Sequence, residues 1–194
     1  MFKDNTRDKI LDTAGRLFSQ RGYFGVSMSQ IASEVGITKA ALYYYFDSKE
    51  EIYLTILKNT FSSLSVVLEK ALSSAKTPFA KLFNVIEAYL SFTLERPETI
   101  LLASSEVEMD GQLAEFTSQA RSQLTQFLKG LISTLGKGSQ ISEEKIMLLG
   151  SFLLEVVRWP FLAASNTPKK LARDIINLFF PKIALGAPGE ETNS

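Results

Sequence analysis

The apolar positions near the start of the chain recur every three or four residues, which is the spacing of one face of an α-helix. This spacing predicts a helix over residues 6–21, with an apolar stripe formed by Ile10, Ala14, Leu17 and Phe18. Gly22 follows directly, and glycine tolerates the left-handed conformation in which many helices end. The first helix is therefore expected to stop at Arg21.

Capping signals predict two short helices after it. Ser27 and Gln30 have the spacing of a capping box, in which each side chain bonds the backbone N–H of the other residue. Gly36 is expected to end the short helix that they open. Thr38 is placed to cap a third helix, which runs through Tyr45.

A second capping box, at residues 48–51, opens a long helix that reaches about Leu72. Beyond it the pattern is more apolar, and no segment shows the alternation typical of a strand. We expect further helices over residues 78–96, 113–135, 142–159 and 168–185. The predicted fold class is all-α, with an N-terminal three-helix domain followed by a C-terminal helical bundle.

The two short helices have the arrangement of a helix-turn-helix, whose tight turn projects the second helix into the major groove of DNA. Leu42 and Phe46 lie four residues apart on that helix and are expected to face inward. The positions left to face outward are Lys39, Ala40, Tyr43 and Tyr44. A lysine can donate to a guanine edge or a phosphate, an alanine can contact a thymine methyl, and a tyrosine hydroxyl can donate to phosphate.

The segment from Ile31 to Glu51 resembles the signature of the TetR family of repressors. It has an aliphatic-Ala pair, a Gly-aliphatic-Thr turn, Leu-Tyr on the second helix and an aromatic-x-x-Lys-Glu exit. The resemblance implies a homodimer that binds palindromic operator DNA and is released by a small ligand in its C-terminal domain. Carried over position by position, it places DNA contacts at Ser27, Met28, Ser29, Thr38, Lys39, Ala40, Tyr43, Tyr44 and Lys49.

Position 29 departs from the family pattern. This chain has Ser29, where many family members place a long basic side chain. Direct base contacts from the first of the two short helices are therefore expected to be few.

The charge of the chain gives DNA binding little support. Lys and Arg total 21, and so do Asp and Glu, which leaves a formal net charge of zero. Residues 1–50 hold seven Lys and Arg against six Asp and Glu. Because affinity for DNA depends on phosphate neutralisation, binding has to come from a few well-placed cations and backbone amides.

The composition also restricts the chemistry. The chain has no Cys and no His, which removes thiolate nucleophiles, disulfides, and the commonest general base and transition-metal ligand. We therefore expect no catalytic residues, no metal site and no cofactor. The run Ile146–Val157 is about half as long as a membrane span, and no signal peptide is apparent, so a cytoplasmic location is expected.

The C-terminal region offers candidates for the effector site and the dimer interface. A ligand cavity between helices would be apolar with a few polar groups, and the candidates for its lining are Phe92, Glu106, Phe116, Phe152, Glu155, Arg158 and Trp159. Helices 142–163 and 168–185 have broad apolar faces, which a second subunit or the same subunit would have to cover. Apolar residues nearly encircle the last of these helices.

The expected organisation is therefore a DNA-binding domain over residues 1–50, with the linking helix starting at 48, a ligand-binding and dimerisation domain over 51–186, and a flexible tail over 187–194. Two other functions stay open. The first is a helical adaptor or ligand-binding protein with little DNA affinity, which the near-neutral N-terminal region favours. The second is an enzyme for small apolar substrates, although nothing pairs Glu106 or Glu155 with a base or oxyanion donors.

Overall fold

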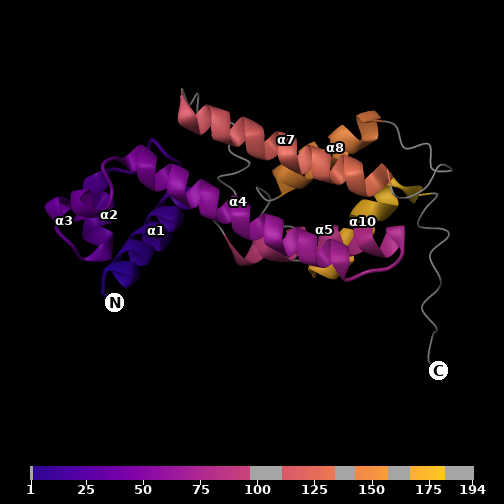
Figure 1. Ribbon diagram of the computed structural model, residues 1–194, viewed down its shortest axis with the longest axis horizontal. Coiled ribbons are helices and arrows are strands. Elements are labelled where there is room, and N and C mark those ends of the chain that lie inside the picture. The colour runs from indigo at the N-terminus through magenta and orange to yellow at the C-terminus, as the bar shows by residue number, and fades with distance from the viewer. Residues whose placement is uncertain (1, 97–110, 134–142, 157–166, 182–194) are drawn as a thin grey trace. The chain divides into compact units, whose positions relative to one another are not determined.

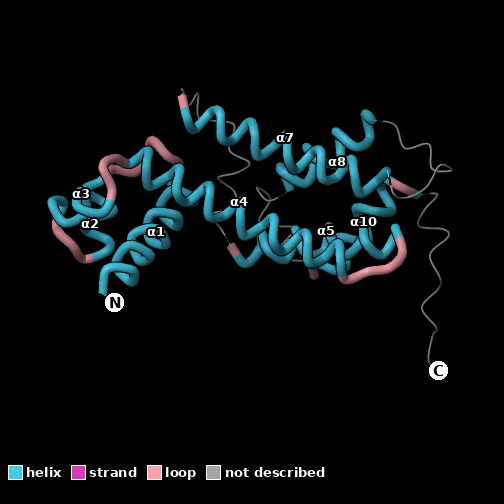
Figure 2. The backbone as a smooth tube through the Cα atoms, viewed as in Figure 1, coloured by secondary structure: helices cyan, strands magenta, loops and turns pink. Residues whose placement is uncertain are grey.

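The computed structural model describes residues 2–96, 111–133, 143–156 and 167–181. Every regular element within these ranges is a helix, as Figures 1 and 2 show. The described helices are α1 (Phe2–Arg21), α2 (Met28–Val35), α3 (Lys39–Tyr45), α4 (Lys49–Ser73), α5 (Pro78–Glu95), α7 (Gln112–Ser133), α8 (Glu143–Val156) and α10 (Pro168–Phe179). The predicted all-α fold class is confirmed.

The helix predicted over residues 168–185 is interrupted at Phe180. Helix α10 ends at Phe179, Pro181 is again helical, and residues 182–185 lie outside the described part of the chain. Phe180 leaves the helical conformation, with φ −134° and ψ 57°. The ring of Pro181 disfavours helical geometry in the residue before it, which explains the break.

The chain forms two compact units. The first contains Met1–Leu64 and Glu95–Ser122, and the second contains Ser65–Leu94 and Gln123–Ser194. Helix α4 contributes residues to both units. The compact units therefore do not divide the chain after residue 50, where the functional boundary is expected. That functional boundary stays a prediction. The tail expected at 187–194 lies outside the described residues.

The core of the first unit lies under the apolar stripe of α1. Ile10 and Ala14 are completely buried, and Leu17 and Phe18 are nearly so, as the spacing predicted. Helix α2 packs against both α1 and α3. The ring of Phe18 meets the ring of Tyr53 from α4 edge to face, with 5.1 Å between the centroids. The three N-terminal helices and the start of α4 thus share one core.

The second unit is held together by one buried side of each of its helices. On α10 that side consists of Leu171, Ala172, Ile175 and Ile176. The hydroxyl of Tyr89 on α5 donates to the carbonyl oxygen of Leu153 on α8 at 2.8 Å, in a buried environment. Gly150 of α8 faces α7, since a Cβ built on it would be in ordinary van der Waals contact with Leu128 Cδ1, at 3.7 Å. None of the described helices is both long and apolar enough to cross a membrane.

Candidate nucleic-acid interface

The capping box that opens α2 is formed as the sequence predicts. The Ser27 hydroxyl accepts from the backbone N–H of Gln30 at 3.3 Å, and the Gln30 side chain accepts from the backbone N–H of Ser27 at 2.8 Å. At the other end Gly36 has φ +82°, a left-handed conformation that favours glycine. Its N–H donates to the carbonyls of Ala32 and Ser33, which closes the helix.

The turn between α2 and α3 is short and fully bonded. The Ile37 N–H donates to the Ala32 carbonyl at 2.9 Å. The Thr38 hydroxyl then accepts from the Ala41 N–H at 3.1 Å and caps α3. Only Ile37 lies between the two caps, and its N–H is bonded as well. Local hydrogen bonds therefore fix the direction of α3 relative to α2.

Helix α3 has one buried side and one exposed side, as predicted. Leu42 is fully buried, and Phe46, which follows the helix, is 1% exposed. The exposed side consists of Lys39, Ala40, Tyr43 and Tyr44. Burial of the first pair holds the helix on the core, so the second set faces solvent in a fixed orientation.

The side chains on the exposed side of α3 are partly ordered by contacts with one another. The Lys39 ammonium lies 5.8 Å from the centre of the Tyr43 ring. The Tyr44 ring meets the half-buried Tyr45 ring edge to face at 5.4 Å. Tyr44 is nevertheless 67% exposed. These aromatic contacts reduce the number of conformations that the exposed side chains have to lose when they bind a partner.

The structure separates Met28 from the other predicted DNA-contact residues. Met28 is 9% exposed and belongs to the buried side of α2. The family resemblance made it a candidate DNA contact, but its place in the core makes it a poor contact residue, and we leave it out of the proposed interface. Exposed positions are occupied by Ser27, Ser29, Thr38, Lys39, Ala40, Tyr43 and Tyr44.

Lys49 has structural partners that the sequence did not reveal. Its ammonium donates to the carbonyl oxygens of Tyr23 at 2.9 Å and Val26 at 2.8 Å, and it lies 4.2 Å from the centre of the Tyr23 ring. Loss of hydration lowers the pKa of this lysine. An ammonium has three N–H donors, so one donor is left for a DNA phosphate.

Side chains of the same segment bond one N–H in the first turn of α4 and one N–H just before it. The Ser48 hydroxyl accepts from the Glu51 N–H at 3.1 Å, and the Glu51 carboxylate accepts from the Asp47 N–H at 2.7 Å. Glu50 and Glu51 also place negative charge in the first turn. The contribution of this helix end to phosphate binding therefore depends mainly on Lys49.

Three cations of α1 that carried no sequence motif support the helix-turn-helix. Arg7 lies over the ring of Phe46, with 4.7 Å from Cζ to the ring centre. Lys9 donates to the Val35 carbonyl at 2.9 Å, at the C-terminal end of α2. Arg16 forms an exposed ion pair with Glu34 at 2.9 Å. The partners lie far from these cations in sequence, so no local pattern predicts the contacts.

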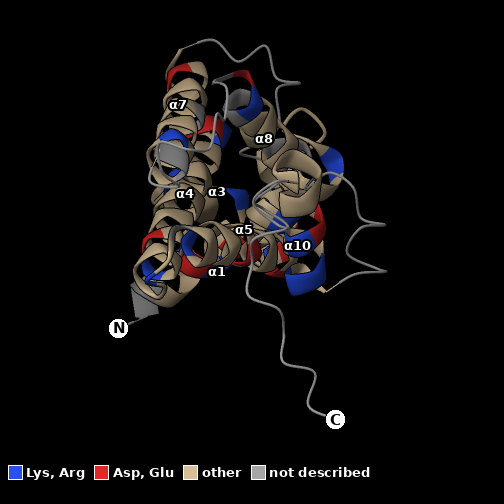
Figure 3. Ribbon diagram, turned by 90° about the vertical axis from the view of Figure 1, so that its right-hand side faces the viewer, with Lys and Arg blue, Asp and Glu red and all other residues tan. Residues whose placement is uncertain are grey.

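Charge is not segregated on the described helices. Lys and Arg alternate with Asp and Glu along them in the view of Figure 3. This agrees with the balanced composition. The interface is therefore defined by the placement of a few groups rather than by a broad basic surface.

Comparison with known proteins identifies this N-terminal region. Residues 10–56 match the family model described as bacterial regulatory proteins, tetR family. The N-terminal region of the chain is therefore similar to the tetR family of bacterial regulatory proteins.

Curated relatives are similar to this chain over a short stretch. The biofilm operon icaADBC HTH-type negative transcriptional regulator IcaR of Staphylococcus epidermidis is 48% identical over 56 residues, or 29% of this chain and 30% of that protein. IcaR of Staphylococcus aureus strain Newman is 47% identical over 62 residues, or 32% of this chain and 33% of that protein. The chain thus spans about a third of the length of these relatives.

Solved structures of TetR-family regulators share the fold over most of the chain. A regulator from Bordetella parapertussis has a TM-score of 0.79 at 21% identity, covering 91% of this chain and 94% of that one. AibR in complex with isovaleryl coenzyme A and operator DNA has a TM-score of 0.80 at 20% identity, covering 91% and 98%. PfmR from Thermus thermophilus has a TM-score of 0.71 at 26% identity, covering 89% and 94%.

The candidate effector-site residues fall into three groups. Phe92 is buried on α5 and Phe152 is half-buried on α8, both in the second unit, where Phe152 lies 5.6 Å from Phe179. Phe116 belongs to the first unit, where its ring meets Phe61 edge to face. Outside the description lie Glu106, Arg158, Trp159 and the side chain of Glu155.

Proposed function

We propose that the protein is a sequence-specific DNA-binding transcriptional repressor. The observation that carries the proposal is the second helix of the helix-turn-helix: α3 is held on the core by Leu42 and Phe46 and presents a cluster of exposed side chains in a fixed orientation. A helix displayed in this way is what the major groove admits. We assign the protein no catalytic residues.

The exposed residues of α3 divide between base reading and positioning. Lys39, at the first turn of the helix, reaches a guanine edge, and Ala40 contacts a thymine methyl. The Tyr43 hydroxyl and the remaining N–H of Lys49 donate to phosphate. Short hydroxyl groups at Ser27, Ser29 and Thr38 add backbone contacts, and Tyr44 is exposed enough to reach a base or a sugar.

The repressor acts as a homodimer on a palindromic operator in the cytoplasm. Helices α8 and α10 form the interface, because each carries a large apolar side chain in water: Leu148 is 61% exposed and Leu178 is 70% exposed. Burial of such side chains by a second copy contributes to association. Two α3 helices of the dimer then lie one DNA turn apart, about 34–36 Å.

A small, largely apolar effector, bound in the C-terminal domain expected over residues 51–186, releases the repressor. Phe92 and Phe152 belong to the proposed lining, together with Phe116, Glu106, Glu155, Arg158 and Trp159. The effector acts by binding more tightly to the form whose α3 spacing does not fit DNA. Helix α4 transmits the change, since it contributes to both compact units.

Selection of DNA from a random-sequence pool tests the proposal without knowledge of the operator. The proposal predicts that several rounds enrich a palindromic sequence, and that affinity for it falls steeply with salt. Weak binding without enrichment of any sequence would instead favour an adaptor with little DNA affinity. For the Lys39→Ala variant of α3, Lys70→Ala is the charge-matched control, because Lys70 is an exposed residue in the last turn of α4.

A further inference from the structure

The first unit contains a cavity between α1 and α4, away from the exposed side of α3. Its volume is about 420 Å³, which lies within the range of small-molecule sites. Leu11 and Ile56 supply an apolar wall, and polar groups surround it. Asp12 and Asn59 are solvent-exposed, so the cavity is accessible from water.

Thr60 is the least expected of the lining residues. It is 5% exposed, and its hydroxyl has no hydrogen-bond partner among the residues that the structure describes. Two other hydroxyls of α4 do bond the preceding turn: Thr55 donates to the Glu51 carbonyl at 2.7 Å and Ser73 to the Glu69 carbonyl at 2.9 Å. A buried hydroxyl without a partner is costly, so a group within the cavity is expected to bond it.

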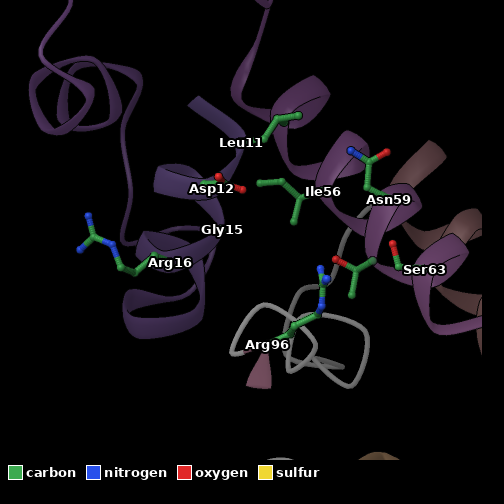
Figure 4. A pocket seen from close by; sticks show the side chains of 9 residues that line it. Leu11, Asp12, Gly15, Arg16, Ile56, Asn59, Ser63 and Arg96 are labelled. Atoms are coloured by element: carbon green, nitrogen blue, oxygen red, sulfur yellow. The ribbon is translucent and has the colours of Figure 1, made fainter. Parts of the chain in front are cut away.

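Three further polar side chains of the cavity share this property. Asp12, Asn59 and Ser63 form neither a hydrogen bond nor an ion pair with any described residue. Figure 4 shows the Asp12 carboxylate and the Arg96 guanidinium directed toward the space beside Ile56, whereas the Arg16 guanidinium points away from it. Arg16 is instead paired with Glu34. The cavity therefore presents one negative and one positive group, together with uncharged hydrogen-bonding groups.

This set of groups limits the class of ligand. A carboxylate accepts only, a guanidinium donates only, and hydroxyl and amide groups do both. Because one charge of each sign lines the cavity, the attraction of an anion to Arg96 is opposed by its repulsion from Asp12, and the reverse holds for a cation. Hydroxyl groups satisfy both kinds of partner without a net charge, and the C–H face of a saturated ring fits the wall of Leu11 and Ile56.

We propose that this cavity binds a small, uncharged polyhydroxylated molecule, such as a monosaccharide or cyclitol, with Thr60 and Asp12 among its partners. This site lies entirely within the first compact unit, and none of its residues belongs to the proposed DNA contacts. None of its residues is among the candidates for the effector site either, so the two sites are separate. A bound molecule would stabilise the first unit by mass action.

Titration calorimetry and ligand-detected NMR on the full chain test the proposal, with D-glucose, D-galactose and myo-inositol as probes and L-serine and L-alanine as zwitterionic comparisons. At least one polyol is expected to bind saturably. Thr60→Val should weaken that binding about three- to tenfold, the loss of one hydrogen bond. Asp12→Asn should weaken it about tenfold or more, because a charge-assisted bond is lost.

Thr55→Val is the matched control, because its hydroxyl is already bonded within α4. It should leave polyol affinity unchanged. The melting temperature of the free protein gives an independent readout: Thr60→Val should not lower it, since this hydroxyl has no protein partner to lose. A lower melting temperature with unchanged binding would mean that Thr60 is structural and would overturn its assignment.

Three other results of these binding experiments would contradict polyol binding in this cavity. Absence of saturable polyol binding would mean that the cavity holds only water. Binding of the amino acids alone would assign the site to zwitterions. Equal polyol binding by wild type, Thr60→Val and Asp12→Asn would place the polyol elsewhere. Each of these results would overturn the proposal, and none bears on DNA binding, which is measured separately.

Discussion

At the scale of single residues, Lys49 connects the start of α4 to the loop between α1 and α2. It does so through two carbonyl oxygens and the Tyr23 ring. Lys49→Met keeps the aliphatic part of the side chain but leaves both carbonyls without this donor. We expect the free energy of unfolding, measured in urea, to fall by about 1–3 kcal/mol.

Lys39→Met provides the comparison for this change. Lys39 is exposed and its only described contact is with Tyr43, so its replacement should alter stability by no more than about 0.5 kcal/mol. If the two variants unfold at the same urea concentration, Lys49 does not hold the loop.

Tyr53 makes the first unit sensitive to alkaline pH. Burial, followed by the nearby charge of ionised Tyr23, raises the pKa of Tyr53 to about 12. The folded-state pKa lies above the unfolded value of about 10. The contribution of neutral Tyr53 to the free energy of unfolding is therefore complete below pH ~10 and is lost as the pH rises through ~12. The loss amounts to about 2–3 kcal/mol.

Tyr53→Phe should therefore unfold over a higher alkaline range than the wild type, in urea titrations at stepwise increasing pH. At neutral pH the variant should be at least as stable, because the Tyr53 hydroxyl has no hydrogen bond within the described part of the chain. Burial, then Glu50, also raises the pKa of Tyr23, so a smaller alkaline loss remains. Identical alkaline transitions in both proteins would exclude Tyr53 as their cause.

At the scale of elements, the loop before α2 depends on Gly25. A Cβ at this position would overlap the carbonyl oxygen of Arg21, which belongs to the backbone and cannot rotate away. Gly25→Ala should therefore shift the loop and lower the free energy of unfolding by about 1–3 kcal/mol in urea or thermal melts.

Gly130→Ala is the matched control for this substitution. A Cβ at Gly130 would have nothing within 4 Å, and the residue is exposed within α7. Alanine should stabilise this helix by about 0.5–1 kcal/mol. Equal stability of Gly25→Ala and the wild type would show that the loop adapts without cost.

Elements with local signals were predictable from the sequence. Ser27, Gly36 and Thr38 act within three or four residues of their own positions, so their caps could be inferred from spacing alone. The same holds for the inward Leu42 and Phe46. Spacing correctly separated the two sides of α3 because a helix repeats every 3.6 residues.

The features that were missed depend on contacts between distant residues or on steric detail. The partners of Lys49 lie 23 and 26 positions away, and no local pattern encodes them. Met28 is buried because α2 turns that side to the core. The interruption at Phe180 was foreseeable from Pro181, which the apolar pattern outweighed in the prediction.

At the scale of the whole molecule, dimerisation tests whether α8 and α10 form an interface. Leu178→Glu places a charge on an exposed apolar position, so it should preserve the subunit fold and shift sedimentation toward monomer. Val66→Glu is the control, because Val66 is 64% exposed on α4, outside the proposed interface. Unchanged sedimentation of Leu178→Glu, or an equal effect of both variants, would contradict this interface.

Because the whole chain has a balanced charge, we expect the sequence specificity of DNA binding to depend mainly on α3. With no broad basic surface to supply affinity, loss of one base-reading side chain should change which sequences bind, and loss of one phosphate contact should weaken all of them. Lys39 and Tyr43 represent these two classes, and both are exposed on the same helix.

The most direct test is the ranking of operator variants by wild type, Lys39→Ala and Tyr43→Phe, measured by fluorescence anisotropy at one fixed salt concentration. The account predicts that Lys39→Ala reorders the variants at one position of each half-site, by about 1–3 kcal/mol, whereas Tyr43→Phe lowers every affinity and keeps the order. An unchanged order for Lys39→Ala would contradict the claim that α3 reads the DNA sequence through this residue.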